Sequence, residues 1–108
     1  SEDRGRLLEN MIYSHLRKSG HDIFYFQESK ECDFVIFNKR KFVRAIQVCD
    51  QITNDNLQRE CDGLLEALVK FKSNIGYIIT NDQEEVIELE GKTIHLIPAD
   101  KYLMNGIG

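Results

Sequence analysis

Two otherwise apolar segments of the chain, each typical of a β-strand, contain or adjoin a polar residue. Asp33 precedes the apolar run FVIF, and Gln47 stands inside the segment RAIQVC. A carboxylate at the mouth of an apolar strand must be hydrated, paired or bound to a metal ion. Because side chains alternate along a strand, Gln47 and Cys49 share one face. If the two strands pair through the turn at 38–40, these residues lie at the same end of the sheet. Carboxylate and amide oxygens that converge there can hold a divalent cation.

Glu9 is a third oxygen donor that can reach this place. It lies at the margin of the apolar stripe of the first helix, close in angle to Ile12 and Leu16. The predicted metal ligands are therefore Glu9, Asp33 and Gln47, with Mg²⁺ or Mn²⁺ as the ion. The alternative is structural. Asp33 is then a strand-edge charge, Gln47 a half-buried amide with its hydrogen bonds satisfied, and Glu9 a glutamate on the rim of a helix.

Hydrophobic periodicity predicts the elements that position these residues. Apolar spacings of three and four predict a first helix over 3–19 and a second, strongly amphipathic helix over 54–72. Segments rich in β-branched and aromatic residues predict strands over 21–29, 31–37, 41–49, 75–80, 85–90 and 93–97. The last two strands form a hairpin with a type II′ turn at Gly91-Lys92, and residues 100–104 form one helical turn.

The order of these elements predicts an α/β fold. Three strands in a row with tight breaks are typical of an antiparallel meander. The nearly all-apolar strand over 75–80 is typical of a strand buried on both faces, which is often parallel to its neighbours. We therefore expect one domain over 1–108, with a mixed β-sheet flanked by helices in the order α-β-β-β-α-β-β-β.

Composition excludes several classes of protein. The 108 residues are 42% hydrophobic and 30% charged, with a net charge of −4, which is typical of a globular domain. No apolar run reaches the roughly 20 residues of a membrane helix. The three cysteines, Cys32, Cys49 and Cys61, form no CxxC pair, so we expect reduced thiols and a cytoplasmic location. The chain opens on Ser1, which indicates a piece of a longer protein.

Charge is unevenly spread along the chain. Residues 1–54 carry nine Lys and Arg against eight Asp and Glu, whereas residues 55–108 carry five against ten. The one basic group consists of Lys39, Arg40 and Lys41, with Arg44 nearby. It is a candidate for nucleic-acid binding, and the alternative is a solvated hairpin tip.

Several strings, taken in order, resemble one prokaryotic family. They are GRLLENMIYSHL, ECDFVIF, RAIQVCD, LLEAL, GYIIT and IHLIPADKYL, and they cover essentially the whole chain. The family is the C-terminal domain of unknown function carried by many bacterial and archaeal AAA-type ATPases. That domain is similar to the PD-(D/E)xK nuclease superfamily, so the resemblance implies a restriction-endonuclease-like three-layer fold.

The superfamily pattern places an acid on the first helix, an acid on the second core strand and (D/E)-x-K on the third. Its acids hold one or two Mg²⁺ ions that activate water. The resemblance implies that Glu9 is the helix acid and Asp33 the strand acid. Gln47 stands at the (D/E) position and Cys49 at the lysine position, so Asp33, Gln47 and Cys49 are the implied catalytic set.

Both third-strand positions depart from the pattern. Glutamine keeps an oxygen ligand but loses a charge, and the Cys49 thiol cannot supply the fixed positive charge of a lysine. The lysines that could migrate into this role are Lys30, Lys41 and Lys70. As a catalytic thiol Cys49 would need a base, and no histidine has a recognisable relation to it. The other interpretation is a small buried cysteine.

The resemblance and its departures predict a nuclease-fold accessory domain that has lost or weakened cleavage and binds nucleic acid or protein. The alternative is an active Mg-dependent DNA endonuclease with a variant site, its DNA steered by the basic residues of 39–44. The implied partners are an ATPase domain N-terminal to this one, and DNA. A second copy could pair with an edge strand of the last hairpin. No Walker motif is present, so this chain itself is not expected to hydrolyse ATP.

Overall fold

A computed structural model describes residues 2–107 of the protein. Its elements are α1 (Glu2–Arg17), β1 (Asp22–Gln27), β2 (Glu31–Asn38), β3 (Lys41–Val48), α2 (Leu57–Lys70), β4 (Ile75–Thr80), β5 (Glu85–Leu89), β6 (Lys92–Pro98) and α3 (Ala99–Asn105). The predicted order of helices and strands is confirmed. The closing helical turn extends to seven residues.

The strands form one mixed sheet in the order β1-β2-β3-β4-β6-β5. The first three strands pair antiparallel, which confirms the predicted meander. β4 pairs parallel with both β3 and β6, as its apolar sequence on both faces predicts. β5 closes the sheet antiparallel to β6 and is an edge strand, as is β1.

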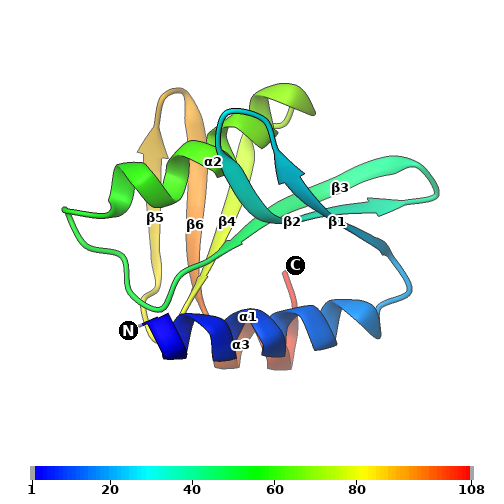
Figure 1. Ribbon diagram of the computed structural model, residues 1–108, viewed down its shortest axis with the longest axis horizontal. Helices are drawn as coiled ribbons and strands as arrows, with labels where there is room; N and C mark the ends of the chain where they lie inside the picture. Colours follow the sequence, from blue (N-terminus) through cyan, green and yellow to red (C-terminus); the bar gives the residue numbers. More distant parts are fainter. Residues whose placement is uncertain (1, 108) are drawn as a thin grey trace.

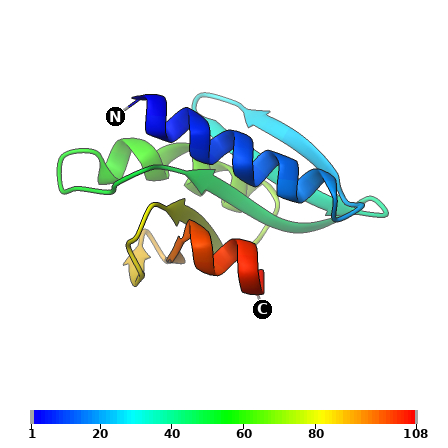
Figure 2. The same ribbon diagram turned by 90° about the horizontal axis from the view of Figure 1, so that it is seen from below.

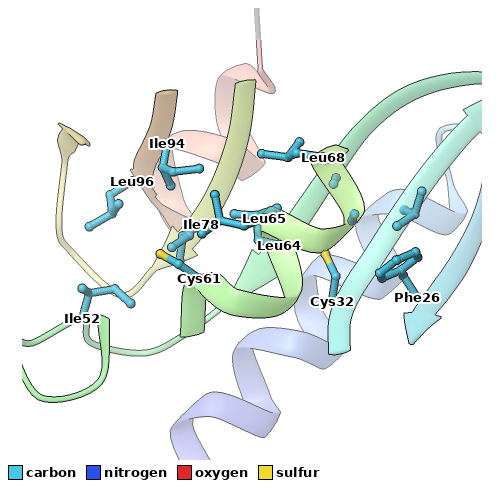
Figure 3. Packing of buried hydrophobic residues seen from close by; sticks show 13 residues of the cluster. Phe26, Cys32, Ile52, Cys61, Leu64, Leu65, Leu68, Ile78, Ile94 and Leu96 are labelled. Atoms are coloured by element: carbon cyan, nitrogen blue, oxygen red, sulfur yellow. The ribbon is translucent and has the colours of Figure 1, made fainter. Parts of the chain in front are cut away.

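Helices cover both faces of the sheet and make three layers (Figure 1). α2 lies across one face, and α1 and α3 lie side by side on the other (Figures 1 and 2). Two apolar clusters fill the two interfaces. Ile12 of α1 and Tyr102 of α3 belong to one, and Leu64 and Leu68 of α2 belong to the other. Figure 3 shows the α2 side chains pointing onto β4 and β6 at one side and towards Cys32 on the other.

Gly63 sets how closely α2 approaches the sheet. A Cβ atom at this position would lie 1.6 Å from the backbone oxygen of Glu31, at the start of β2. Only a residue without a side chain lets two backbones come this near. The first turn of α2, which precedes Gly63, is thereby held beside the end of the sheet where β2 begins.

The turn of the last hairpin differs in detail from the expectation. In the last hairpin Leu89 pairs with Lys92, so the turn is Glu90-Gly91 and not Gly91-Lys92. Both turn residues have positive φ, 51° and 78°, which makes the turn type I′ and not type II′. The type I′ turn matches the twist of the flanking strands even though Glu90 is not a residue that favours positive φ.

No helix between residues 2 and 107 has the length and apolar character needed to cross a membrane.

Candidate functional site

The polar residues predicted to act together do meet at one end of the sheet. Glu9, Asp33, Gln47 and Cys49 all line one pocket of about 480 Å³, and Glu60 lines it as well. We call this the acidic pocket and define it by these five residues. Its other lining residues are Gly5, Val48, Asp50, Gln51, Asn56 and Arg59. The amino-terminal halves of α1 and α2 and the loop after β3 lie together on this side of the molecule, at the left in Figure 1.

The pocket forms where the pairing of β2 with β3 stops. The backbone ladder runs up to the pair Phe34–Ile46, although both strands continue past it. The β1–β2 register also shifts here, because Phe24 faces Val35 whereas Phe26 faces Cys32. β3 instead continues alongside β4. Two strands that part in this way leave backbone groups that need other partners.

Asp33 and Gln47 supply those partners. One carboxylate oxygen of Asp33, Oδ2, accepts a hydrogen bond from the backbone N–H of Val48 at 2.9 Å. In return the backbone N–H of Asp33 donates to the side-chain oxygen of Gln47 at 3.0 Å. Each side chain thus replaces a ladder bond that the other strand no longer provides. This reciprocity explains why a carboxylate and an amide stand at these two positions.

Glu60 of α2 is the residue that the sequence-based set lacks. The Gln47 amide nitrogen donates to Glu60 Oε1 at 3.3 Å, so Gln47 bridges the strand end to the helix. Glu60 directly precedes the buried Cys61, at the margin of the apolar stripe of α2. That is the same kind of position that singled out Glu9 on α1, so this signal was present in the sequence.

Negative charge is concentrated in the acidic pocket. Burial raises the pKa of Asp33 to about 7, the Val48 hydrogen bond opposes this, and Glu9 and Glu60 raise it further. Burial also raises the pKa of Glu9, with an opposing effect of Arg6 and a smaller rise due to Glu60. Within the pocket Glu60 has one cationic partner, Arg59, at 3.6 Å, and the Arg59 side chain is 74% exposed.

Cys49 lies in the pocket as a protonated thiol. Burial and then the charge of Glu60 raise the pKa of Cys49 to about 11, so the thiol is neutral near pH 7. Its Sγ lies 3.4 Å from the backbone oxygen of Gln51. A neutral thiol beside carboxylates is a weak nucleophile and brings no positive charge. None of Lys30, Lys41 and Lys70 lines the pocket in its place.

The acids of the pocket do not form a ready metal site. Gln47 Oε1, one of the predicted ligands, already accepts from the Asp33 N–H. Across residues 2–107, no three His, Cys, Asp or Glu side chains converge closely enough to hold a metal ion. The raised pKa values of Asp33 and Glu9 are due first to burial and then to the neighbouring acids.

The predicted nucleic-acid residues lie elsewhere. Lys39 and Arg40 form the turn between β2 and β3, and Lys41 begins β3. Six residues of strand separate Lys39 from Asp33, which is about 20 Å at about 3.3 Å per residue. Arg44 is held apart from the turn, since its guanidinium donates to the Ile107 carbonyl at 3.3 Å. The structure therefore places the basic group and the acidic pocket at opposite ends of the β2–β3 pair.

Comparison with known proteins yields a family and one uncharacterised relative. Residues 4–102 match the family described as "Domain of unknown function (DUF4143)". The chain is 34% identical over 113 residues to "Uncharacterized protein MJ1544" of Methanocaldococcus jannaschii. The match covers 94% of this chain and 25% of that protein, so the chain spans about a quarter of the length of this relative.

Proposed function

The chain belongs to the DUF4143 family, and we propose that it is a nuclease-fold accessory domain of an AAA-type ATPase that binds its partner without cleaving it. The archaeal relative is about four times as long as the matched region, which leaves room for an ATPase domain in a parent chain. The three-layer fold supports the likeness to the PD-(D/E)xK superfamily. The cytoplasm is the proposed location.

One observation carries the proposal that cleavage is lost. The Gln47 side chain is used at both ends, accepting from the Asp33 N–H and donating to Glu60. A residue tied in this way holds β2, β3 and α2 together and does not offer its oxygen to a metal ion. In this proposal the position that would carry the (D/E) ligand has a structural role instead.

The chemistry of phosphodiester hydrolysis supports the same conclusion. Attack on a phosphate develops negative charge that an enzyme must stabilise with a metal ion, a lysine or an arginine. The acidic pocket presents carboxylates and a neutral thiol, and the cation that lines it, Arg59, is largely exposed to solvent. A phosphate approaching this pocket meets repulsion.

The second candidate is a Mg-dependent nuclease with a variant site. It is favoured by the raised pKa values of Asp33 and Glu9, because clustered acids of this kind are also what a divalent cation relieves. Binding would require Gln47 and Glu60 to give up their hydrogen bond and turn towards the ion.

Calorimetry with Mn²⁺ separates these two candidates. Wild type, Asp33→Asn and the control Asp82→Asn are titrated in parallel, because Asp82 is exposed and outside the pocket. The accessory-domain proposal expects no binding to any of the three and no cleavage of linear or branched DNA. Mn²⁺ binding that is lost only in Asp33→Asn, together with cleavage that is lost in the same variant, would replace it with the nuclease.

A further inference from the structure

Five of the six phenylalanines form one aromatic cluster, and two of them, Phe37 and Phe42, pair beside the β2–β3 turn, at the end of these strands away from Asp33. The Phe42 and Phe71 rings stack with centroids 5.1 Å apart, and Phe37 meets both edge-on at 6.0 and 5.4 Å. Phe24 contacts Phe37 at 5.7 Å, and Phe26 contacts Phe71 at 5.9 Å. Phe26 is buried, three of the others are half-buried, and Phe24 is 54% exposed. The cluster joins β1, the β2–β3 hairpin and the end of α2. Phe37, Phe42 and Phe71 pack against the buried core, and Phe24 is the ring that the cluster exposes to solvent.

Exposed cations stand on both sides of the stacked pair. Lys39, Arg40 and Lys41 directly precede Phe42, and Lys72 directly follows Phe71. None of these four takes part in an ion pair among residues 2–107, in contrast to Lys70, which lies 3.7 Å from Glu28. Among the strand residues that pair near this turn, the acidic one is Asp22, which pairs with Phe37 of β2. This end is therefore locally positive on a chain whose net charge is −4.

The backbone at three of these cations is strained. Lys39, Arg40 and Lys72 have φ of 52°, 70° and 57°, values that favour glycine or asparagine. They are three of the four non-glycine residues with positive φ in the described part of the chain. An Asn-Gly pair would suit the hairpin turn better, and glycine would suit the position after α2. Long cationic side chains thus occupy three positions where asparagine or glycine would stabilise the fold, although Glu90 shows that such strain alone does not identify a binding residue.

We propose that this end of the molecule binds single-stranded nucleic acid. The binding surface consists of Phe24, Phe37, Phe42 and Phe71 with Lys39, Arg40, Lys41 and Lys72, and we call it the hairpin–helix surface. The cations bind backbone phosphates, and the exposed Phe24 ring, supported by the other phenylalanines, contacts the face of a base. Such faces are free in a single strand and covered by stacking in a duplex. This inference rests on the binding role proposed above and names the ligand class and the surface that performs it.

Geometry supports a single strand over a duplex. The β2–β3 hairpin projects from the body of the molecule beyond the helices (Figure 1). A narrow hairpin with a small aromatic face fits a flexible strand that can wrap it. A two-stranded ribbon can also enter a major groove, but an exposed aromatic ring beside the cations suits bases whose faces are free. Charge complementarity and aromatic surface therefore point to the same ligand.

The test is fluorescence anisotropy with a labelled oligothymidine and with a duplex of equal length, over a range of salt. Four cations on a single strand predict a slope of log K against log salt of about −3, at about −0.7 for each contact. The double variant Lys39→Asn/Arg40→Gly supplies the preferred turn and should halve that slope. It should weaken binding about tenfold or more at low salt while raising Tm. Higher Tm with lower affinity shows that the loss is not due to unfolding.

A matched control lies in the other hairpin. Glu90→Asn also creates an Asn-Gly type I′ turn and should raise Tm in the same way, but it should leave oligothymidine affinity unchanged. Wild type that fails to bind oligothymidine at low salt, duplex bound as well as the single strand, or equal affinity of the double variant and wild type would each overturn the proposal. Asp33→Asn is measured alongside. Loss of binding in that variant alone would place the ligand in the acidic pocket, and neither result depends on the Mn²⁺ titration.

Discussion

The two ends of the β2–β3 pair are built from opposite chemistry. At one end Asp33 and Gln47 replace missing backbone hydrogen bonds, and Gln47 also bonds to Glu60. At the other end Lys39 and Arg40 occupy strained turn positions, and their charges face solvent. At the acidic end, polar and charged side chains stabilise the fold. The turn end keeps its charged residues at a cost to the fold, and that difference locates binding at the turn.

Helix α2 connects the two ends, so displacing it should have the largest effect. Gly63→Ala would put a methyl group 1.6 Å from the Glu31 backbone oxygen, which the strand cannot avoid without moving. We expect a loss of about 3 kcal/mol or more in the free energy of unfolding, measured by urea denaturation. Gly5→Ala in α1 is the control, because its Cβ would meet nothing within 4 Å and should stabilise by about 0.5–1 kcal/mol. A Gly63→Ala variant as stable as wild type would show that α2 is not held by this contact.

The acidic end should make stability depend on pH. The pKa of Asp33 is raised to about 7 in the fold from an ordinary value near 3.8. The folded chain then keeps a proton that the unfolded chain has released, so this contribution is complete below about pH 4 and declines as pH rises through 7. We expect wild type to lose about 2 kcal/mol between pH 5 and pH 8 relative to Asp33→Asn. Parallel curves for the two proteins would mean that Asp33 titrates normally.

An acid at position 47 should make the stability of the acidic end depend more strongly on pH. Gln47→Glu removes the donor to Glu60 and sets a further carboxylate beside Asp33. We expect a loss of about 1–3 kcal/mol at pH 8 and a smaller loss at pH 5, where the cluster is partly protonated. Gln27→Glu, on the exposed end of β1, is the control for a carboxylate added outside the pocket. It faces Glu31 across the strands and should cost less than about 1 kcal/mol. Equal effects at both pH values would show that the pocket acids do not interact.

The smallest effect is expected from adding a cation to the acidic end. Cys49→Lys places an ammonium group near Glu60, the acid that acts most strongly on the Cys49 thiol. It should reduce the loss of stability between pH 5 and pH 8 by about 1 kcal/mol, because Glu60 then raises the pKa of Asp33 less. Cys49→Ser keeps the size without the charge and should leave the pH dependence as in wild type. No difference between these two variants would place position 49 outside the cluster.

Much of this architecture follows from local pattern. The spacing of Leu64 and Leu68 predicts the second helix, and the apolar run around Ile78 predicts a strand buried on both faces. Asp33 and Gln47 could be brought to one end of the sheet because a short turn joins their strands, although a register shift between Ile36 and Phe37 sets the final pairing. Sequence patterns predict these elements because each helix or strand is determined by residues close together in the chain.

The remainder depends on contacts that local rules cannot give. The close approach of Gly63 to Glu31 joins residues far apart in the chain, and that contact is what brings Glu60 to Gln47. The phenylalanine cluster likewise assembles from β1, the hairpin and the end of α2, so no single segment shows it. The prediction of a type II′ turn in the last hairpin was wrong, because it assumed glycine at the first turn position. The strand register puts Glu90 there.

The bond from Val48 to the Asp33 carboxylate gives the protein an internal reporter. In an ordinary ladder an amide proton faces a carbonyl, whose charge does not change with pH. The Val48 amide faces an ionisable group instead, so its NMR resonance should follow the protonation of Asp33 directly. A single backbone signal can thus read the charge state of the acidic end, without a probe or a substitution, while the opposite end is free to engage a ligand.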